Sequence, residues 1–268
     1  MTLQELTQKQ KEIIDHIYHY RFLSSFHIQQ LLKNKDRSQI NKWLNYLTEN
    51  NYLYREISTK LKENTKPAIY YINKNGIRYL RIYKNVDSNL VQNLYYESKR
   101  KYTFRTHCLS LADLICNLQN HARSQNKTAK IYTRVDYANA EDSEDDSLYL
   151  LYKLSPDAYY TYNGSGIAKA CFIEVIDEQI KPSDLQRKIA KYIKAREDGE
   201  EEALGLERFP LIACVLPNQK KLSELKRIIK RTKAKYIDDE PDLEIRFNLT
   251  LISDIQTKSI AEAIWEKA

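Results

Sequence analysis

Two short and almost wholly apolar runs limit the fold of this chain more than any other feature. They are CFIEVI, residues 171–176, and LIACVL, residues 211–216. Runs of this length and composition are typical of strands that are covered on both faces. The segment between them, residues 182–195, places Leu185, Ile189 and Ile193 at helical spacing. The pattern therefore predicts strand, helix, strand within an α/β domain.

The neighbouring segments extend this pattern and predict a mixed sheet over residues 86–268. We expect helices at 104–121 and 221–232 and a closing helix at the end of the sequence. Residues 86–103 are predicted to be a helical junction with the preceding domain. The further strands are expected at AKIYTRV (129–135), LYLLYKL (148–154), AYYTYN (158–163) and LEIRFNLTLI (243–252).

The first 85 residues follow a different order, which predicts a separate winged helix-turn-helix domain. Helices are expected at 8–21 after Thr7, from a Ser24 or Ser25 cap to Leu32, and at 37–49. The strand-like segments NYLYREIS and AIYYIN follow, separated by a polar stretch. Three helices and a hairpin in this order are typical of the winged helix. The whole chain is thus predicted to be α+β, with a DNA-binding domain at 1–85.

The third predicted helix has a polar face that suits the major groove of duplex DNA. Amides, hydroxyls and basic groups reach base edges there, while lysines of the hairpin tip can lie along phosphates. The alternative is an ordinary solvated helix face. The candidate DNA-binding residues are Arg37, Ser38, Gln39, Asn41, Lys42 and Asn45 on the helix and Lys60, Lys62 and Lys66 in the hairpin.

Composition narrows the class of protein. A formal net charge of +7 and a pI near 9.0 favour a polyanionic partner, although solvated basic surfaces are also common. We find no apolar run of 18 residues and no signal-peptide pattern at the start, so we expect a cytoplasmic protein. The four cysteines lie in apolar surroundings without CxxC pairing and are expected to be free thiols. Motifs for dinucleotide or P-loop binding are absent.

Three acidic residues lie on or beside the central predicted strands: Asp157, Glu174 and Asp177. Each can be a turn-capping or solvated carboxylate, which is the simpler interpretation. The order of elements nevertheless resembles the PD-(D/E)xK nuclease fold, which has a helix, three strands, a helix and a further strand. Pro156-Asp157 and Glu174 match that motif, with YNGSG as the turn between their strands.

This resemblance implies a Mg²⁺ site, because carboxylates from adjacent strands supply the oxygen ligands that Mg²⁺ prefers. Asp157 and Glu174 would hold the metal and Asp177 would assist. The family's lysine two residues after the acidic position is replaced here by Ile176. Lys188, on the following predicted helix, is the candidate substitute that would orient water or stabilise the phosphate.

The winged helix combined with LSPDAYY, FIEVIDEQI and PSDLQRKIAKY resembles the replication-relaxation family of plasmids and mobile elements. The resemblance implies a duplex-DNA-binding protein acting in replication, relaxation or transfer of such an element. Two alternatives stay open: an active Mg²⁺-dependent endonuclease or nickase, and a winged-helix transcriptional regulator. Besides DNA, candidate partners are the element's replication or transfer proteins and a second copy of the chain, but no membrane.

Two charged segments lie outside these motifs. The predicted helix QKKLSELKRIIKRTKAK has a basic outer face, for which solvation and phosphate contact are both reasonable interpretations. The acidic cluster AEDSEDD, residues 140–146, is expected to be a solvated loop, with phosphate mimicry as the alternative.

Overall fold

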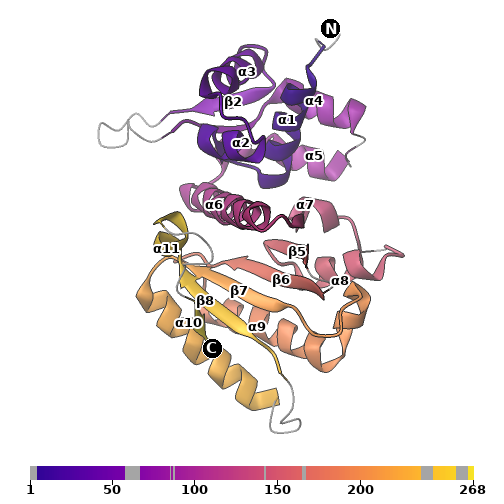
Figure 1. Ribbon diagram of the computed structural model, residues 1–268, viewed down its shortest axis with the longest axis vertical. Coiled ribbons are helices and arrows are strands. Elements are labelled where there is room, and N and C mark those ends of the chain that lie inside the picture. Colours follow the sequence, from indigo (N-terminus) through magenta and orange to yellow (C-terminus); the bar gives the residue numbers. More distant parts are fainter. Residues whose placement is uncertain are drawn as a thin grey trace. The chain divides into compact units, whose positions relative to one another are not determined.

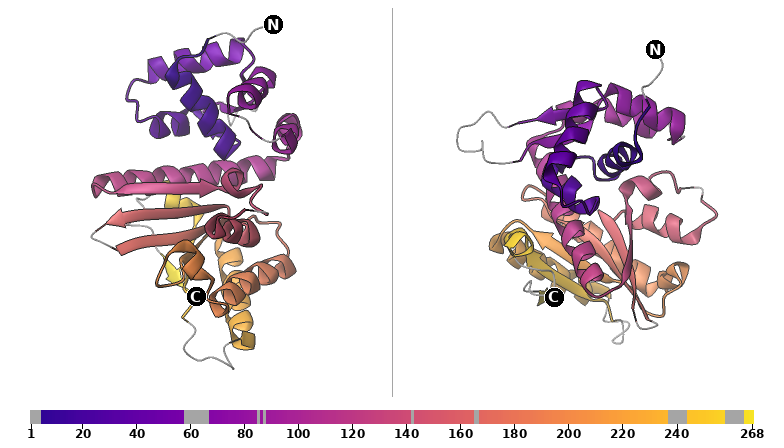
Figure 2. Two further views of the ribbon diagram at one scale, coloured as in Figure 1. Left: turned by 90° about the vertical axis from the view of Figure 1, so that its right-hand side faces the viewer. Right: turned by 45° about the horizontal axis from the view of Figure 1, so that its top comes forward.

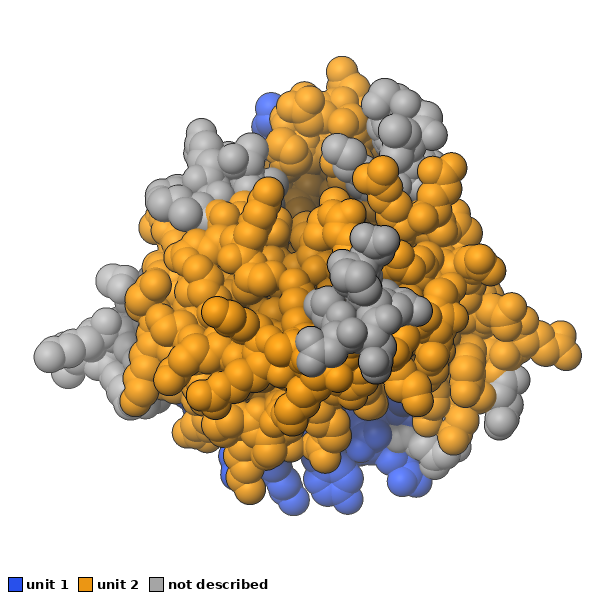
Figure 3. All heavy atoms as spheres, turned by 90° about the horizontal axis from the view of Figure 1, so that it is seen from below, with its two compact units in different colours: residues 1–116 blue, residues 117–268 orange. Residues whose placement is uncertain are grey.

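A computed structural model of the chain describes residues 5–57, 67–84, 86, 88–141, 143–164, 167–236, 244–257 and 265–268. The chain forms two compact units, residues 1–116 and 117–268, which Figure 3 distinguishes by colour. Helix α6 (Tyr102–Ser124) runs across the boundary between them. Each unit has its own sheet, so we describe them separately.

The first unit is built around three helices and a small antiparallel sheet (Figure 1). The helices are α1 (Gln8–Tyr20), α2 (Ser25–Leu31) and α3 (Arg37–Glu49). The strands are β1 (Leu23–Ser24), β2 (Leu53–Glu56) and β3 (Ile69–Ile72), in the spatial order β1-β3-β2. The elements α4 (Lys74–Tyr83), α5 (Ser88–Leu94) and the 3₁₀ turn η2 (Glu97–Lys99) follow. This arrangement confirms the predicted winged helix-turn-helix.

Side-chain caps set where the helices of this unit begin. Thr7 and Gln10 form a capping box at α1, and the Ser24 hydroxyl accepts a hydrogen bond from the His27 N–H at α2. Asp36 accepts from the N–H groups of Ser38 and Gln39 at α3, at 2.8 and 3.2 Å. Each of these caps lies directly before the first turn of its helix, so the cap residues indicate in the sequence where a helix begins.

The second unit contains a six-stranded mixed sheet in the order β4-β5-β6-β7-β8-β9. The strands β4 to β6 pair antiparallel, β6 to β8 pair parallel, and β9 returns antiparallel. The strand bounds are β4 (Thr128–Thr133), β5 (Ala158–Gly164), β6 (Ile167–Val175), β7 (Leu211–Leu216), β8 (Phe247–Leu251) and β9 (Glu266–Lys267).

Two long helices cover one face of this sheet. They are α9 (Pro182–Glu197), which connects β6 to β7, and α10 (Gln219–Tyr236), which connects β7 to β8. Parallel strands are joined by right-handed crossovers, so both helices lie on the same face, as Figure 2 shows. Together with the end of α6, this gives a helix, three antiparallel strands, a helix and a parallel strand. That topology is the nuclease-like α/β fold expected from the sequence.

The segment LYLLYKL was predicted to be a strand, and this prediction is wrong. It forms α8 (Asp146–Leu154), which follows the short helix α7 (Arg134–Tyr137). Asp145 caps its first turn, and Ser155 ends it in a left-handed conformation. Leu150, Leu151 and Leu154 are buried, a helical spacing that the run of apolar residues concealed.

The core of the second unit lies between the sheet and the helices α8, α9 and α10. Its largest buried side chains include Phe172, Phe247 and Tyr192. The closing helix is α11 (Ile252–Thr257), and the 3₁₀ turn η3 (Glu200–Leu204) follows α9. None of the helices in the described ranges is both long and apolar enough to cross a membrane.

Candidate functional site

Glu174 lies in the core of the second unit rather than at its surface. It shares one face of β6 with Phe172, because alternate residues of a strand point the same way, and Ile176, directly after the strand, belongs to the same core. That face is covered by α9, and Glu174 is only 2% exposed. Its Oε1 accepts a hydrogen bond from the Tyr192 hydroxyl at 2.5 Å, and its Oε2 forms an ion pair with Lys188 Nζ. Both partners come from α9, one turn apart.

Asp157 immediately precedes β5 and is also buried, with 3% of its surface exposed. Its main-chain N–H donates to the Ile173 carbonyl at 2.9 Å. Its Oδ2 accepts from the Val175 N–H at 2.8 Å, and its Oδ1 pairs with the Arg134 guanidinium at 2.7 Å. Asp157 therefore contacts the end of β6 directly, and Arg134 is held beside it from α7.

The four charged side chains Arg134, Asp157, Glu174 and Lys188 influence one another. Burial raises the pKa of Glu174, and the nearby Asp157 adds to that shift, whereas Lys188 and the Tyr192 hydroxyl oppose it. Burial lowers the pKa of Lys188, but the charges of Glu174 and Asp157 outweigh that and the net shift is upward. We call these four residues the charge cluster. Its two cations balance its two carboxylates.

The two carboxylates have the right chemistry for Mg²⁺, but their arrangement does not fit the ion. Mg²⁺ requires near-octahedral geometry and usually keeps several waters. Here each of the four carboxylate oxygens already faces a protein donor, and both residues are almost fully buried. In the described part of the chain no group of three or more His, Cys, Asp or Glu is placed to hold a metal. Mg²⁺ would have to displace Arg134 and Lys188.

The structure brings together three of the four candidate catalytic residues. Asp157, Glu174 and Lys188 meet in the charge cluster, whereas Asp177 takes no part in the contacts just described. Asp177 lies two residues beyond the end of β6 and is partly exposed. Ile176, which replaces the in-strand lysine, is 4% exposed and continues the core, and its N–H donates to the Val215 carbonyl at 2.8 Å.

The sequence pattern did not predict the role of Arg134. Tyr192 entered only as part of the segment PSDLQRKIAKY, which resembles the replication-relaxation family, and not as a hydrogen-bond donor. Arg134 stands at the end of a predicted strand, and only the turn into α7 directs it towards Asp157. Its Nε also donates to the Pro156 carbonyl, which the Tyr137 hydroxyl contacts as well. Tyr192 was identifiable from its position four residues after Lys188, which places both side chains on one side of α9.

The predicted DNA-binding face of α3 lies on the surface of the first unit. Ile40, Leu44 and Leu47 are buried, and Asp36 caps the helix. The opposite side carries the six predicted contact residues, and among these six Gln39 is half-buried. The exposed ones are Arg37, Ser38, Asn41, Lys42 and Asn45. Lys60, Lys62 and Lys66, predicted for the hairpin tip, lie outside the described residues.

These two units define a class of protein, a winged helix-turn-helix joined to a PD-(D/E)xK nuclease-like domain. Comparison with known families then identifies the family within this class. Residues 14–206 match the replication-relaxation family, and the chain therefore belongs to it. The match includes most of the winged helix, the charge cluster and α9, but it ends before α10.

Two solved structures of the restriction endonuclease FokI, one of them bound to DNA, are similar to this chain at 12% sequence identity. Their TM-scores are 0.29 for the DNA complex and 0.30 for the other structure. Each comparison covers 96% of this chain but 45% of FokI, so this chain spans less than half the length of FokI. So distant a likeness carries no argument about fold or activity. No curated protein matches the sequence.

Proposed function

We propose that this protein binds double-stranded DNA of a plasmid or mobile element through α3 and acts in the replication, relaxation or transfer of that element. Membership of the replication-relaxation family supports the process. The winged helix supports the mode of binding, because its third helix is the element that enters the major groove in helix-turn-helix proteins.

The exposed polar face of α3 is the observation that carries this proposal. A helix whose apolar side is fully buried is fixed on its domain, so its outer side chains are presented in a defined register. Arg37, Asn41 and Lys42 occupy neighbouring positions on that outer face. Arg and Lys suit guanine and Asn suits adenine, and a good bidentate contact discriminates by about 1–3 kcal/mol.

Selection from a random duplex library tests the proposal. The native protein should enrich a defined sequence over successive rounds. A variant with Arg37→Ala, Asn41→Ala and Lys42→Ala, which we call the α3 variant, should enrich none, because it lacks the side chains that reach base edges. Enrichment of the same sequence by both proteins would refute the assignment of α3.

A matched control separates the loss of these side chains from a loss of net charge or of folding. The control carries Lys101→Gln, Lys130→Gln and Lys194→Gln, three exposed lysines on separate segments. It loses three positive charges, one more than the α3 variant, and should still enrich the native sequence. Circular dichroism of both variants should match that of the native protein, because all six replaced side chains are exposed and substitutions at exposed positions seldom change stability much.

Cleavage of DNA is a second candidate function, favoured by one observation. Lys188 contacts Glu174 from the following helix, so a lysine is present at the acidic pair although Ile176 occupies the usual position. The arrangement described above opposes this function, because each oxygen of the two carboxylates already faces a protein donor. Arg134 has a side chain that is 55% exposed and could leave Asp157 without disturbing the core.

Nicking of supercoiled plasmid in the presence of Mg²⁺ or Mn²⁺ tests this second function. The native protein should be compared with Asp157→Asn, which preserves the shape of the side chain and an oxygen that can accept from Val175. Nicking that is lost in Asp157→Asn would establish an enzyme. Equal nicking by both would indicate a contaminant, and no nicking by the native protein would leave DNA binding alone.

A further inference from the structure

The excess positive charge of this protein is concentrated on one helix of the second unit. Helix α10 contains eight Lys and Arg residues and a single acid, Glu224, and so carries a net charge of +7. The whole chain has 43 basic and 36 acidic residues, with the same net charge of +7. The remaining residues therefore hold 35 of each sign and are neutral in total. A charge distribution this uneven requires an explanation beyond solubility.

Three of the eight cations on α10 are engaged by the protein itself. Lys221 pairs with Glu224 at 2.9 Å and donates to the Ile180 carbonyl at 2.9 Å. Lys226 pairs with Glu266. Lys233 donates to the main-chain oxygen of Ala268 at 3.0 Å, and burial lowers its pKa. These three serve the structure of the unit.

The other five cations are exposed, and their side chains make no hydrogen bond or ion pair with any described residue: Lys220, Arg227, Lys230, Arg231 and Lys235. Lys220, Arg227 and Arg231 form a line along the helix, because offsets of seven and eleven residues fall within about 20° of the starting direction. The line is about 17 Å long at 1.5 Å per residue. Duplex DNA presents a phosphate about every 3.4 Å of axis on each strand, so such a line faces several phosphates.

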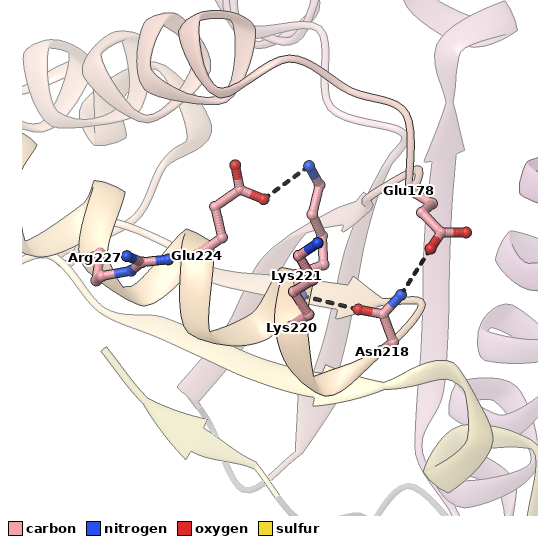
Figure 4. A pocket seen from close by; sticks show the side chains of 6 residues that line it. All are labelled: Glu178, Asn218, Lys220, Lys221, Glu224 and Arg227. Atoms are coloured by element: carbon pink, nitrogen blue, oxygen red, sulfur yellow. Dashed lines mark hydrogen bonds and ion pairs between the residues drawn. The ribbon is translucent and has the colours of Figure 1, made fainter.

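A hollow of about 350 Å³ lies at the start of this line (Figure 4). Lys220 and Arg227 line it, together with Asn218, Lys221, Glu178 and Glu224. Both of its carboxylates already have partners: Glu224 pairs with Lys221, and Glu178 accepts from the Asn218 side chain at 3.2 Å. Lys220 and Arg227 are therefore the cations of the hollow left for an anionic group of a ligand.

The opposite face of α10 decides between nucleic acid and a membrane as the anionic partner. A basic helix that enters a membrane interface inserts its apolar face between the lipids. In α10 that face is committed to the protein core: Leu222, Leu225 and Ile229 are at most 2% exposed. Only the charged face is available, which suits a phosphate backbone.

We infer that α10 is a second DNA-binding surface, in which Lys220, Arg227 and Arg231 contact the phosphate backbone of duplex DNA without reading its sequence. This inference rests on the proposed binding of duplex DNA by the protein. It assigns affinity to the second unit and specificity to α3 of the first. Lys235 is left out, because the acidic residues Asp238, Asp239, Glu240 and Asp242 follow it closely in sequence and lie outside the described residues.

The salt dependence of binding to a duplex without a preferred sequence tests this inference. Three proteins are compared by fluorescence anisotropy between about 50 and 200 mM KCl: the native protein, an α10 variant and the lysine control described above. The α10 variant carries Lys220→Gln, Arg227→Gln and Arg231→Gln. We call the slope of the logarithm of affinity against the logarithm of salt concentration the salt slope. For the α10 variant the salt slope should be less negative by about 2.7, since each lost phosphate contact changes it by about 0.9. The control should keep the native slope.

Each outcome bears on a separate proposal. An α10 variant with the native slope overturns the inference about α10, even if the native protein still enriches a sequence through α3. An α3 variant that still enriches that sequence overturns the proposed role of α3 but not the inference about α10. If the triple variant fails to fold, Arg227→Gln alone should still make the salt slope less negative by about 0.9. The native protein could instead bind phosphatidylserine vesicles. If the α10 variant loses that binding while its salt dependence on DNA stays native, α10 would be assigned to a membrane surface.

Discussion

At the scale of single residues, the charge cluster shows how a carboxylate can be stable inside a sheet-and-helix core. Glu174 is surrounded by Phe172, Ile176 and Tyr192, so an uncompensated charge there would be very unfavourable. Lys188 supplies the opposite charge and Tyr192 a hydrogen bond. Such a pair adds little net stability, but removing one member leaves the other without its counter-charge, and the remaining Lys188 would be only 22% exposed.

Glu174→Ala should therefore destabilise the second unit by about 3–5 kcal/mol. The chain has only two tryptophans, Trp43 in the first unit and Trp265 in the second. Urea unfolding followed by fluorescence in a Trp43→Phe background then reports on the second unit. The exposed Glu178→Ala should change the free energy of unfolding by less than about 0.5 kcal/mol. Equal effects of the two substitutions would contradict the burial of the cluster.

His16 predicts a pH dependence of the first unit. Burial, followed by the nearby His19, lowers the pKa of His16 to about 4. In the unfolded chain His16 has a pKa near 6.5, so it takes up a proton at a higher pH than in the folded chain. The neutral, buried His16 therefore contributes its full stability above about pH 6.5, and this contribution is lost as the pH falls towards 4. Between pH 7 and 5 the loss should be about 2 kcal/mol relative to His16→Phe. Unfolding curves of both proteins in a Trp265→Phe background measure it, and parallel pH profiles would refute it.

At the scale of elements, α4 depends on a glycine for its position. An added Cβ at Gly76 would lie 2.4 Å from the Tyr52 carbonyl oxygen, a main-chain atom that cannot turn away. That carbonyl also accepts from the Asn73 N–H at 2.9 Å, at the start of α4. The close approach fixes the helix against the residue that precedes β2.

Gly76→Ala should accordingly destabilise the first unit, although alanine is the better helix former by about 1 kcal/mol. We expect a net loss of about 1–3 kcal/mol from the forced displacement. Thermal unfolding followed by Trp43 fluorescence measures it, with the exposed Lys74→Ala as control. A stabilised Gly76→Ala protein would show that α4 is not packed as described.

Most elements could be predicted from the sequence, because period and capping residues agreed. Thr7 and Ser24 marked helix starts, and the apolar runs of β6 and β7 marked buried strands. The prediction for residues 148–154 was wrong because Leu and Tyr fit a strand as well as a helix. The burial of Leu150, Leu151 and Leu154 distinguishes the helix from a strand, and burial is not visible in the sequence. β1 has two residues, too few for any period to be visible.

The candidate site was predictable only in part, for a physical reason. Asp157 directly precedes β5, Glu174 lies on the adjacent strand β6, and Lys188 lies on the helix that follows β6, so the topology alone brings them together. Arg134 reaches Asp157 from the short helix α7, between β4 and α8, a region whose fold the sequence pattern did not reveal. The neutralisation of Asp157 by Arg134, and so its poor fit to Mg²⁺, could not be predicted.

At the scale of the whole molecule, the account divides DNA binding between two surfaces with different chemistry. The face of α3 combines amide, hydroxyl and basic side chains, which suits base edges. The face of α10 carries Lys and Arg almost alone, which suits phosphates. Specificity and salt-dependent affinity should then respond to substitutions independently, because the two sets of side chains belong to different units.

The most direct measurement is the ratio of affinities for the selected duplex and for a scrambled duplex at one salt concentration. The native ratio should be at least about 10³, as in other specific DNA-binding proteins. The α10 variant should bind both duplexes more weakly and keep the native ratio, whereas the α3 variant should bind both alike, with a ratio near 1. A native ratio retained by the α3 variant would contradict the account at its centre.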